Sequence, residues 1–356
     1  MQLKKINEVR RRLMQNITRN VGKSHANRGI VLTDANEITR ILVSRPNDRL
    51  GNLLLITPLL QEIAHTFPNC KIDLFVRGGA APTIFAHYGF VDRIIMLPKR
   101  PFSHLFTYCK RWLSIRKKKY DLVINVEKNS SSGKLSALFA RSKYKFFGEV
   151  SEDLGKQYPD YNHIAKYPVY NLRHFLTTLG FVRNKKYIAP LDLKLDAVEV
   201  AEGAAILQKM TDNNKKTIAL FTFATGNKCY CETWWADFYS QLQTRFPDYN
   251  LIEVLPVQNV SQIQYQAPSF YSKNIREIGS LIANADLFIG ADSGIMHLAA
   301  SVHTPTVGLF SVTNIRKYEP YGKGSLGINT NETSLPDTIS AIEKLLKAKQ
   351  LHPQSA

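Results

Sequence analysis

The stretch Asp286–Phe310, DLFIGADSGIMHLAASVHTPTVGLF, predicts the fold because it combines two strands, a glycine turn and a helix in one short run. Its apolar segments Leu287–Ile289 and Thr306–Phe310 are bounded by turn residues, as buried parallel strands are. Between them the sequence predicts a helix over Ile295–Ser301. Units in which a helix connects two such strands build a parallel sheet.

The start of this helix is a candidate anion site. Asp292, Ser293 and Gly294 supply a capping side chain, a hydroxyl and a glycine, and the free backbone N–H groups of a helix start attract phosphate. His297 follows one turn later on the same side of the helix. An ordinary N-cap followed by a core histidine is the alternative.

The run D-S-G-x-x-H-L-A-A, followed by T-P and an apolar strand ending at Phe310, resembles the signature of the heptosyltransferase family, family 9 of the glycosyltransferases. The resemblance implies that this helix start binds the diphosphate of a nucleotide-sugar donor. It also implies a GT-B-like α/β fold, in which two doubly wound Rossmann-like domains hold the active site in the cleft between them.

The first half of the chain has the same alternation of strands and helices. Apolar runs at 41–44, 71–76, 93–98 and 120–126 predict parallel strands, with one long helix after the loop 45–52. In a doubly wound sheet the ligand binds beyond the carboxyl ends of the strands, so this loop is a candidate for the chemistry.

Within the loop, Leu50-Gly51-Asn52 resembles the family's leucine-glycine-aspartate step, whose aspartate is the presumed general base toward the acceptor hydroxyl. Asn52 cannot take a proton, although it can orient the acceptor by hydrogen bonding. Asp48 is therefore the substitute candidate for the catalytic base. Helix capping, or pairing with Arg45 or Arg49, is the alternative role of Asp48.

Four residues are candidates for binding the acceptor in the first domain: Arg45, Arg49, Asn129 and Ser132. The first two flank Asp48, and the last two belong to a serine-rich loop after the strand at 120–126. A Ser-Gly turn that caps the next helix explains the serine-rich loop equally well.

The second domain supplies further candidates for donor binding. The exit of a strand predicted at 217–224 resembles the family's donor-phosphate loop, and it contains Thr222, Thr225 and Lys228. Lys228 would neutralise the leaving diphosphate, so that transfer needs neither a metal nor another cofactor; an ordinary surface lysine is the alternative. Glu253, near the end of the next strand, is expected near the donor ribose by the same resemblance.

We expect four segments: a basic helical extension (1–37), an acceptor-binding domain (38–185), a nucleotide-sugar-binding domain (186–335), and a C-terminal helix and tail (336–356). The last helix is expected to pack on the first domain, as in two-domain transferases of this type.

The composition is that of a folded cytoplasmic protein. The 356 residues are 44% hydrophobic and 21% charged, and neither a membrane-spanning run nor a signal-peptide pattern is evident. The four cysteines lack metal-ligand spacing and are expected to be free thiols, so no metal site is predicted.

The net charge of +18 is concentrated in the first half, where residues 1–180 carry 30 Lys and Arg against 13 Asp and Glu. Residues 1–29 predict a basic amphipathic helix, which either lies on an anionic membrane or packs on the protein. Residues 99–119 hold eight basic residues, no acid, and aromatic residues. Such a composition is typical of a segment that binds the inner face of the cytoplasmic membrane or of one that binds nucleic acid. An ordinary helix with its aromatic residues in the core is the alternative. Because no nucleic-acid motif accompanies the segment, lipid or phosphoglycolipid is the favoured partner.

The function implied by the resemblance is an inverting, metal-independent transfer of a sugar, heptose from ADP-heptose, to a lipopolysaccharide or related glycolipid. The basic first domain fits such an anionic acceptor. The alternative is a catalytically silent relative that binds glycolipid or a partner enzyme, and Asn52 is its main support. A nucleic-acid-binding protein is a third alternative, supported by charge alone.

Overall fold

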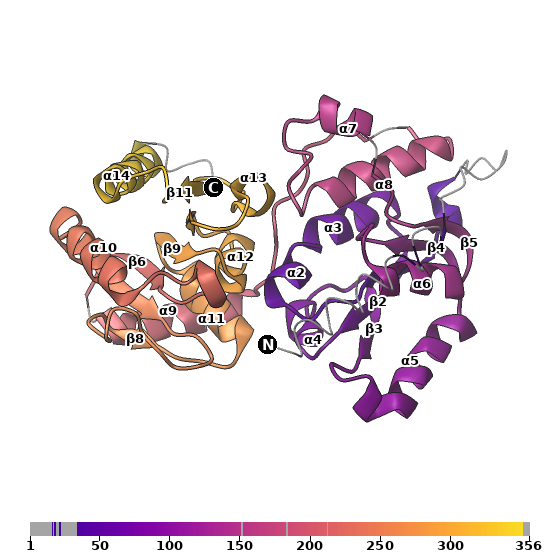
Figure 1. Cartoon of the computed structure of the whole chain (residues 1–356), viewed down its shortest axis with the longest axis horizontal. Helices are drawn as coiled ribbons and strands as arrows, with labels where there is room; N and C mark the ends of the chain where they lie inside the picture. The colour runs from indigo at the N-terminus through magenta and orange to yellow at the C-terminus, as the bar shows by residue number, and fades with distance from the viewer. Residues whose placement is uncertain are drawn as a thin grey trace. The chain divides into compact units, whose positions relative to one another are not determined.

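The computed structural model describes residues 34–150, 152–182, 184–211 and 213–351, together with Asn16, Thr18, Val21 and Gly22. Apart from these four positions, the amphipathic helix expected over 1–29 lies outside the described residues. The chain forms two compact units (Figure 1). Unit 1 comprises the described residues up to Asp48 and Pro58–Ala189, and unit 2 comprises Arg49–Thr57 and the chain from Pro190 onward.

Unit 1 is built on a parallel sheet with the strand order β3-β2-β1-β4-β5. Its strands are β1 (Arg40–Arg45), β2 (Lys71–Arg77), β3 (Val91–Leu97), β4 (Lys119–Asn125) and β5 (Arg141–Phe146). The first four match the predicted strands. The fifth was not predicted; it alternates apolar Tyr144 and Phe146 with Lys143 and Lys145. Lysines on an edge strand discourage pairing with another chain.

Helices cover both faces of this sheet. They are η1 (Ala35–Glu37), α3 (Thr57–Thr66), α4 (Ala81–Ile84), η2 (Phe102–His104), α5 (Leu105–Lys117), α6 (Ser131–Phe139), α7 (Glu152–Gln157) and α8 (Tyr167–Thr178). Helices α5 and α6 pack on one face, where Ile115 and Ala137 join Leu42 and Phe75 in a buried cluster. Helices α3 and α8 lie on the opposite side of the sheet from α5 (Figure 1). The predicted doubly wound architecture is confirmed in this unit.

The long helix predicted after β1 is two helices, α2 (Leu50–Leu54) and α3. Pro58 explains the interruption, because it has no N–H to donate to the carbonyl of Leu54. The hydroxyl of Thr57 donates to that carbonyl instead, at 2.7 Å. The break coincides with the point at which the chain leaves unit 2 and re-enters unit 1.

Unit 2 contains a six-stranded parallel sheet with the order β11-β10-β9-β6-β7-β8. The strands are β6 (Lys216–Phe221), β7 (Tyr249–Val254), β8 (Ser269–Phe270), β9 (Leu287–Ala291), β10 (Thr306–Phe310) and β11 (Leu326–Asn329). All residues of β9 and β10 are buried, as their apolar sequences predict. Strands β8 and β11 were not predicted, because such short segments carry little hydrophobic pattern.

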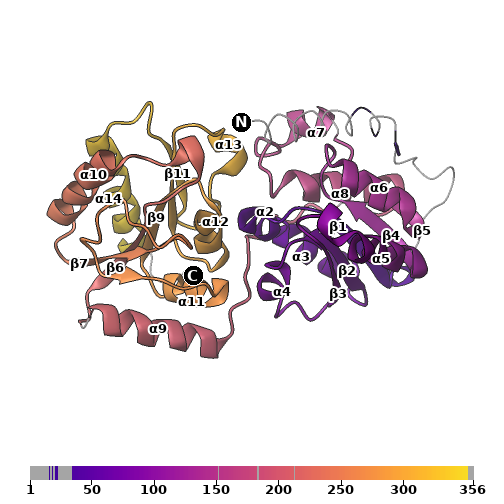
Figure 2. The same cartoon turned by 60° about the horizontal axis from the view of Figure 1, so that its bottom comes forward.

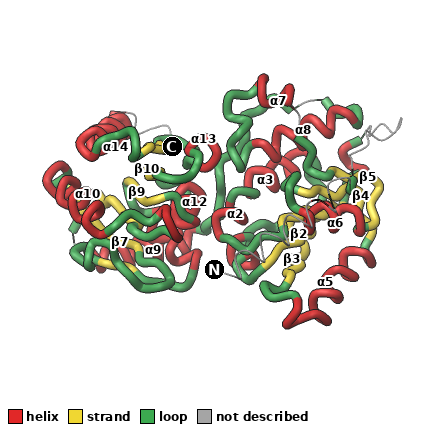
Figure 3. The backbone as a smooth tube through the Cα atoms, in the orientation of Figure 1, coloured by secondary structure: helices red, strands yellow, loops and turns green. Residues whose placement is uncertain are grey.

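The helices of unit 2 alternate with its strands (Figure 3). They are α9 (Ala197–Thr211), η3 (Gly226–Lys228), α10 (Glu232–Arg245), α11 (Ile275–Ala283), α12 (Gly294–Ser301), α13 (Ile315–Tyr318) and α14 (Leu335–Leu351). The expectation that the C-terminal helix packs on the first domain is wrong. Ile339, Ile342 and Leu346 of α14 are buried in the core of unit 2, in one cluster with Trp235 and Phe238 of α10. Among the described residues, no helix has the length and apolar character needed to cross a membrane.

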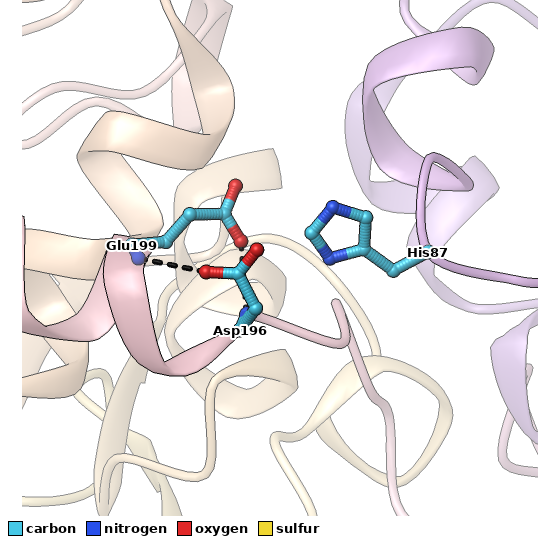
Figure 4. Close-up of side chains that lie close together, drawn as sticks. All are labelled: His87, Asp196 and Glu199. Carbon is cyan, nitrogen blue, oxygen red and sulfur yellow. Dashed lines mark hydrogen bonds between the residues drawn. The ribbon is translucent and has the colours of Figure 1, made fainter.

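Reciprocal hydrogen bonds fix the start of α9. The side chain of Asp196 accepts from the backbone N–H of Glu199 at 2.8 Å, and the Glu199 side chain accepts from the N–H of Asp196 at 3.0 Å (Figure 4). This arrangement is a capping box. Glu199 also forms an ion pair with Arg276 of α11. The guanidinium of Arg276 in turn donates to the carbonyl of Leu193 at 3.1 Å, which fastens the chain entering the unit.

A glycine sets the distance between α9 and α11. A Cβ atom at Gly203 would lie 2.2 Å from the carbonyl oxygen of Ser280 and 2.8 Å from the backbone nitrogen of Leu281. Both are backbone atoms and cannot rotate away. The two helices therefore keep their spacing only while this position has no side chain.

Gly203→Ala should destabilise unit 2, because the added methyl group must push the two helix backbones apart. We expect the free energy of unfolding to fall by about 3 kcal/mol, measured by urea unfolding followed by tryptophan fluorescence. Gly89→Ala is the control, since a Cβ there would meet nothing within 4 Å. Equal stability of the two variants would contradict the close packing of α9 on α11.

Candidate functional site

The turn between β9 and α12 lies at the carboxyl edge of the sheet in unit 2. Strand β9 is paired with both β10 and β6, so the turn lies between two neighbouring strand ends. Ser293 is the N-cap of α12 and its side chain accepts from the N–H of Met296 at 3.3 Å. The predicted cap, Asp292, is instead the residue before the cap. The helix itself begins at Gly294, one residue earlier than expected.

Asp292 has a different role, which is to hold the loops of two other strands. Its Oδ2 lies 3.3 Å from Nζ of Lys228, which follows β6, and accepts from the hydroxyl of Thr313, which follows β10, at 2.6 Å. The Asp292 side chain is 8% exposed and that of Lys228 is 27% exposed. The carboxylate thus fixes an accessible ammonium group near the positive end of α12. The structure thus brings the two candidate residues Lys228 and Asp292 together.

Thr313, Tyr230 and Thr330 were not predicted, although they line the same edge of the sheet. The hydroxyl of Tyr230 lies 2.7 Å from that of Thr330, and its ring stacks on Trp234 with the centroids 4.3 Å apart. Burial raises the pKa of Tyr230, and hydrogen bonds with hydroxyl groups oppose the rise. Position was an available signal for Thr313, which follows the predicted strand β10 by three residues. Thr330 directly follows β11, which was not predicted, so no such signal pointed to it.

Thr222 and Glu253 lie beneath this edge. The hydroxyl of Thr222 donates to Oε1 of Glu253 at 2.5 Å and accepts from the N–H of Gln262 at 3.1 Å. Burial raises the pKa of Glu253, while hydrogen bonds from Ser261 and Thr222 oppose the rise. The two side chains are 1% and 0% exposed, so in this structure they support the loop after β6 and are covered by protein. Thr225, in the same loop, is exposed.

Two glycines allow α2 to pack on α12 within unit 2. A Cβ at Gly294 would lie 3.2 Å from Cβ of Leu50 and 3.3 Å from the nitrogen of Gly51. A Cβ at Gly51 would lie 2.8 Å from Cδ2 of His297, so the buried imidazole covers the backbone of α2. The two motifs on which the family resemblance rests therefore contact each other. Asn52, the next residue of α2, is half-buried.

The carboxyl edge of the sheet in unit 1 holds several predicted acceptor residues. Arg45, the last residue of β1, is 7% exposed and its Nη1 lies 3.2 Å from Oε2 of Glu127. The hydroxyl of Tyr167 donates to the same oxygen at 2.9 Å. Neither Glu127 nor Tyr167 was predicted, although Glu127 lies just beyond a predicted strand end. Arg45 is thus held by an ion pair at this edge.

Asp48 and Arg49 are exposed, and the boundary between the two compact units falls between them. Asp48 lies next to Gly78, which has a φ angle of +77°, and a Cβ at Gly78 would approach Cβ of Asp48 to 2.9 Å. The loop after β2 therefore packs against the loop that contains the candidate base. Glycine is required at this position for both its backbone angle and the close approach.

The serine-rich loop has the capping geometry that was the alternative to acceptor binding. Ser130 is the N-cap of α6, and its side chain accepts from a backbone N–H three residues later at 3.1 Å. Asn129 is exposed and Ser132, within α6, is half-buried. Thr18 donates to the hydroxyl of Ser131 at 2.9 Å, so a residue near the N-terminus contacts this helix start.

Comparisons of sequence agree with this architecture. The model of glycosyltransferase family 9 (heptosyltransferase) matches residues 272–344, which include the β9–α12–β10 unit. Lipopolysaccharide heptosyltransferase 1 of Campylobacter coli is 25% identical over 288 residues, which cover 74% of this chain and 82% of that protein. Lipopolysaccharide heptosyltransferase 3 of Escherichia coli is 24% identical over 352 residues, which cover 83% of this chain and 96% of that protein.

Solved structures show the same fold. The crystal structure of the glycosyl transferase family 9 from Veillonella parvula matches with a TM-score of 0.67 at 17% identity, covering 87% of this chain and 97% of that one. The E. coli heptosyltransferase WaaC with ADP matches with a TM-score of 0.60 at 16% identity, covering 86% of this chain and 100% of that one. The two parallel α/β sheets therefore form a GT-B-like fold. In sequence and fold the chain thus resembles glycosyltransferase family 9, and among its named relatives the lipopolysaccharide heptosyltransferases.

Proposed function

We propose that the chain is an inverting, metal-independent glycosyltransferase. Its donor is a nucleotide sugar, a heptose linked to ADP, and its acceptor is a lipopolysaccharide or related glycolipid reached from the cytoplasm at the inner face of the cytoplasmic membrane. The curated relatives named above are lipopolysaccharide heptosyltransferases, and the similar WaaC structure contains ADP. The first finding supports heptose as the transferred sugar, and the second supports ADP as the nucleotide.

The observation that carries the proposal is the position of Lys228. Its ammonium group is held by Asp292 beside the start of α12, where Ser293 and the first backbone N–H groups of the helix are located. An ammonium group and a helix start together suit a diphosphate, which carries several negative charges. Because Asp292 also accepts from Thr313, the pair is fixed before a ligand binds. The remaining donor candidates, Thr222, Thr225, Glu253, Gly294 and His297, belong to the elements around this pair.

In the proposed reaction, an acceptor hydroxyl attacks the anomeric carbon from the face opposite the diphosphate. The bond from that carbon to the diphosphate oxygen breaks, and the configuration inverts. Lys228 and the N–H groups of α12 stabilise the charge that develops on the leaving diphosphate, which is the role a metal ion has in other transferases. The proton of the acceptor hydroxyl passes to a carboxylate, which we propose is Asp48.

Asp48 is the better candidate for the base because its side chain is an exposed carboxylate, whereas Asn52 can only orient the acceptor. Exposed Arg49 and Asn129 are proposed to contact the anionic acceptor, together with half-buried Ser132. Arg45 is buried and paired with Glu127, so we propose that it supports the acceptor-binding edge by holding Glu127 in place. The alternative function, binding of glycolipid or a partner enzyme without catalysis, retains the same donor pocket.

Thermal unfolding in the presence of ADP, UDP, GDP or CDP tests the donor pocket. We expect selective stabilisation by ADP, of about 2.7 kcal/mol at a hundredfold excess over the dissociation constant. Lys228→Ala and Ser293→Ala should abolish the shift, because they remove the ammonium group and the capped helix start. Lys344→Ala, an exposed lysine on α14, is the matched control and should bind normally. If none of the four nucleotides stabilises the protein, the donor pocket is wrongly assigned.

Asp48→Asn tests the catalytic base. We expect kcat for sugar transfer to fall by about 10²–10⁴-fold, because the acceptor proton then has no base, while stabilisation by ADP stays unchanged. Asp237→Asn, an exposed position on α10, should leave kcat unchanged. Recovery of activity in Asp48→Asn/Asn52→Asp would identify Asn52 as an ancestral base position. An unmodified chain that binds ADP but transfers no sugar to any glycolipid acceptor would support the binding-only alternative.

A further inference from the structure

We propose that the outer face of α5 binds to an anionic lipid bilayer. This outer face consists of Leu105, Phe106, Cys109, Lys110, Leu113 and Lys117, which recur at intervals of one, three and four residues. All six are exposed. The proposal adds a membrane contact to the proposed function, but its test uses no substrate and no catalytic residue.

The inner face of α5 already attaches the helix to unit 1. Ile115 is fully buried, and the ring of Trp112 packs edge-on against Phe75 of β2 with the centroids 5.2 Å apart. Trp112 also contacts Phe139 of α6, with the centroids 6.0 Å apart. Because these contacts hold the helix, the apolar residues on the outer face are not needed to fold the unit.

The outer face exposes an unusual amount of apolar surface for one helix. Phe106 is 82% exposed, Leu105 is 58% exposed and Leu113 is 53% exposed. Figures 1 and 2 show α5 on the outside of unit 1. Apolar side chains gathered on one side of a surface helix gain free energy when they enter the interfacial region of a bilayer.

The charge around this face selects the kind of membrane. The segment 99–119 contains eight Lys and Arg residues and no acid. Lys118 lies 3.3 Å from Asp92 and 3.7 Å from Asp73, and Arg116, although exposed, donates to the carbonyl of Phe139, so these two cations have partners within the unit. Lys99, Arg100, Lys110, Lys117 and Lys119 are exposed. Exposed cations beside an apolar face are complementary to the phosphates of anionic lipids.

The orientation of the aromatic residues favours lipid over nucleic acid. Binding of single-stranded nucleic acid relies on exposed rings that stack on bases. Tyr108 and Trp112 are instead turned toward the core, where both pack against the buried cluster of unit 1. The outer face offers one ring, Phe106, flanked by the aliphatic side chains of Leu105 and Leu113. Aliphatic side chains have no stacking surface, but they insert well between lipid chains.

Co-sedimentation of the full chain with lipid vesicles tests the proposal. We expect binding to vesicles of equimolar phosphatidylcholine and phosphatidylglycerol, and little binding to phosphatidylcholine alone. Phe106→Glu should weaken binding by about tenfold or more, because it removes the largest inserted side chain and adds a negative charge that the anionic lipids repel. Lys110→Glu/Lys117→Glu should weaken binding to the anionic vesicles as well, and added salt should have the same effect.

Val198→Glu is the matched control, because it changes an apolar side chain that is 67% exposed on another helix, α9. It should bind vesicles like the unmodified chain. All variants should keep the unmodified melting temperature and the ADP response, because the substituted side chains are exposed. The proposal is overturned if the unmodified chain ignores anionic vesicles, if Phe106→Glu binds as well as Val198→Glu, or if single-stranded DNA displaces the protein from the vesicles by binding α5 more tightly.

Discussion

The ion pair between Lys228 and Asp292 is the constraint on which the candidate donor site depends. It joins the loop after β6 to the loop after β9, and the hydroxyl of Thr313 adds the loop after β10. These three strands are neighbours in the sheet, so one carboxylate ties together three adjacent strand ends. A charge placed in this way beside a helix start is preorganised, and it needs little rearrangement when a diphosphate arrives.

The contact of α2 with α12 extends this site to a segment far away in the sequence. Gly51 and Gly294 allow the two helix starts to approach closely, and His297 covers the resulting contact. As a consequence, the Leu50-Gly51-Asn52 step belongs to the compact unit that carries the candidate donor site. The segment Arg49–Thr57 that contains it is flanked on both sides by residues of the other unit. The imidazole of His297 thus has a packing role, whatever it does toward a ligand.

Local patterns predicted most of the fold. The β9–α12–β10 unit was predicted because its strands are continuous apolar runs and its helix starts with capping residues. The proline after Thr57 was a visible signal for the break between α2 and α3, but the apolar residues on both sides suggested one helix. Strand β5 was missed because lysines interrupt it, and the packing of α14 depends on contacts with α10 that no local pattern encodes.

The candidate site was predictable only in part, for a similar reason. Lys228 and Ser293 were identifiable from the motifs around them. The partners that fix the site were not identifiable. Thr313 and Tyr230 lie at the site because of the order of the strands in the sheet. That Ser293 and not Asp292 caps α12 depends on the backbone conformation of the turn. In unit 1, the ion pair between Arg45 and Glu127 joins the end of β1 to the loop after β4, which are adjacent in space and distant in the chain.

The most direct test of the central claim is a crystal structure of the chain with ADP. The account predicts that the diphosphate lies at the start of α12, with an oxygen within hydrogen-bond distance of the Gly294 N–H and another within reach of Nζ of Lys228. An ADP molecule bound elsewhere on the chain, with Lys228 still paired to Asp292 and the start of α12 unoccupied, would contradict it.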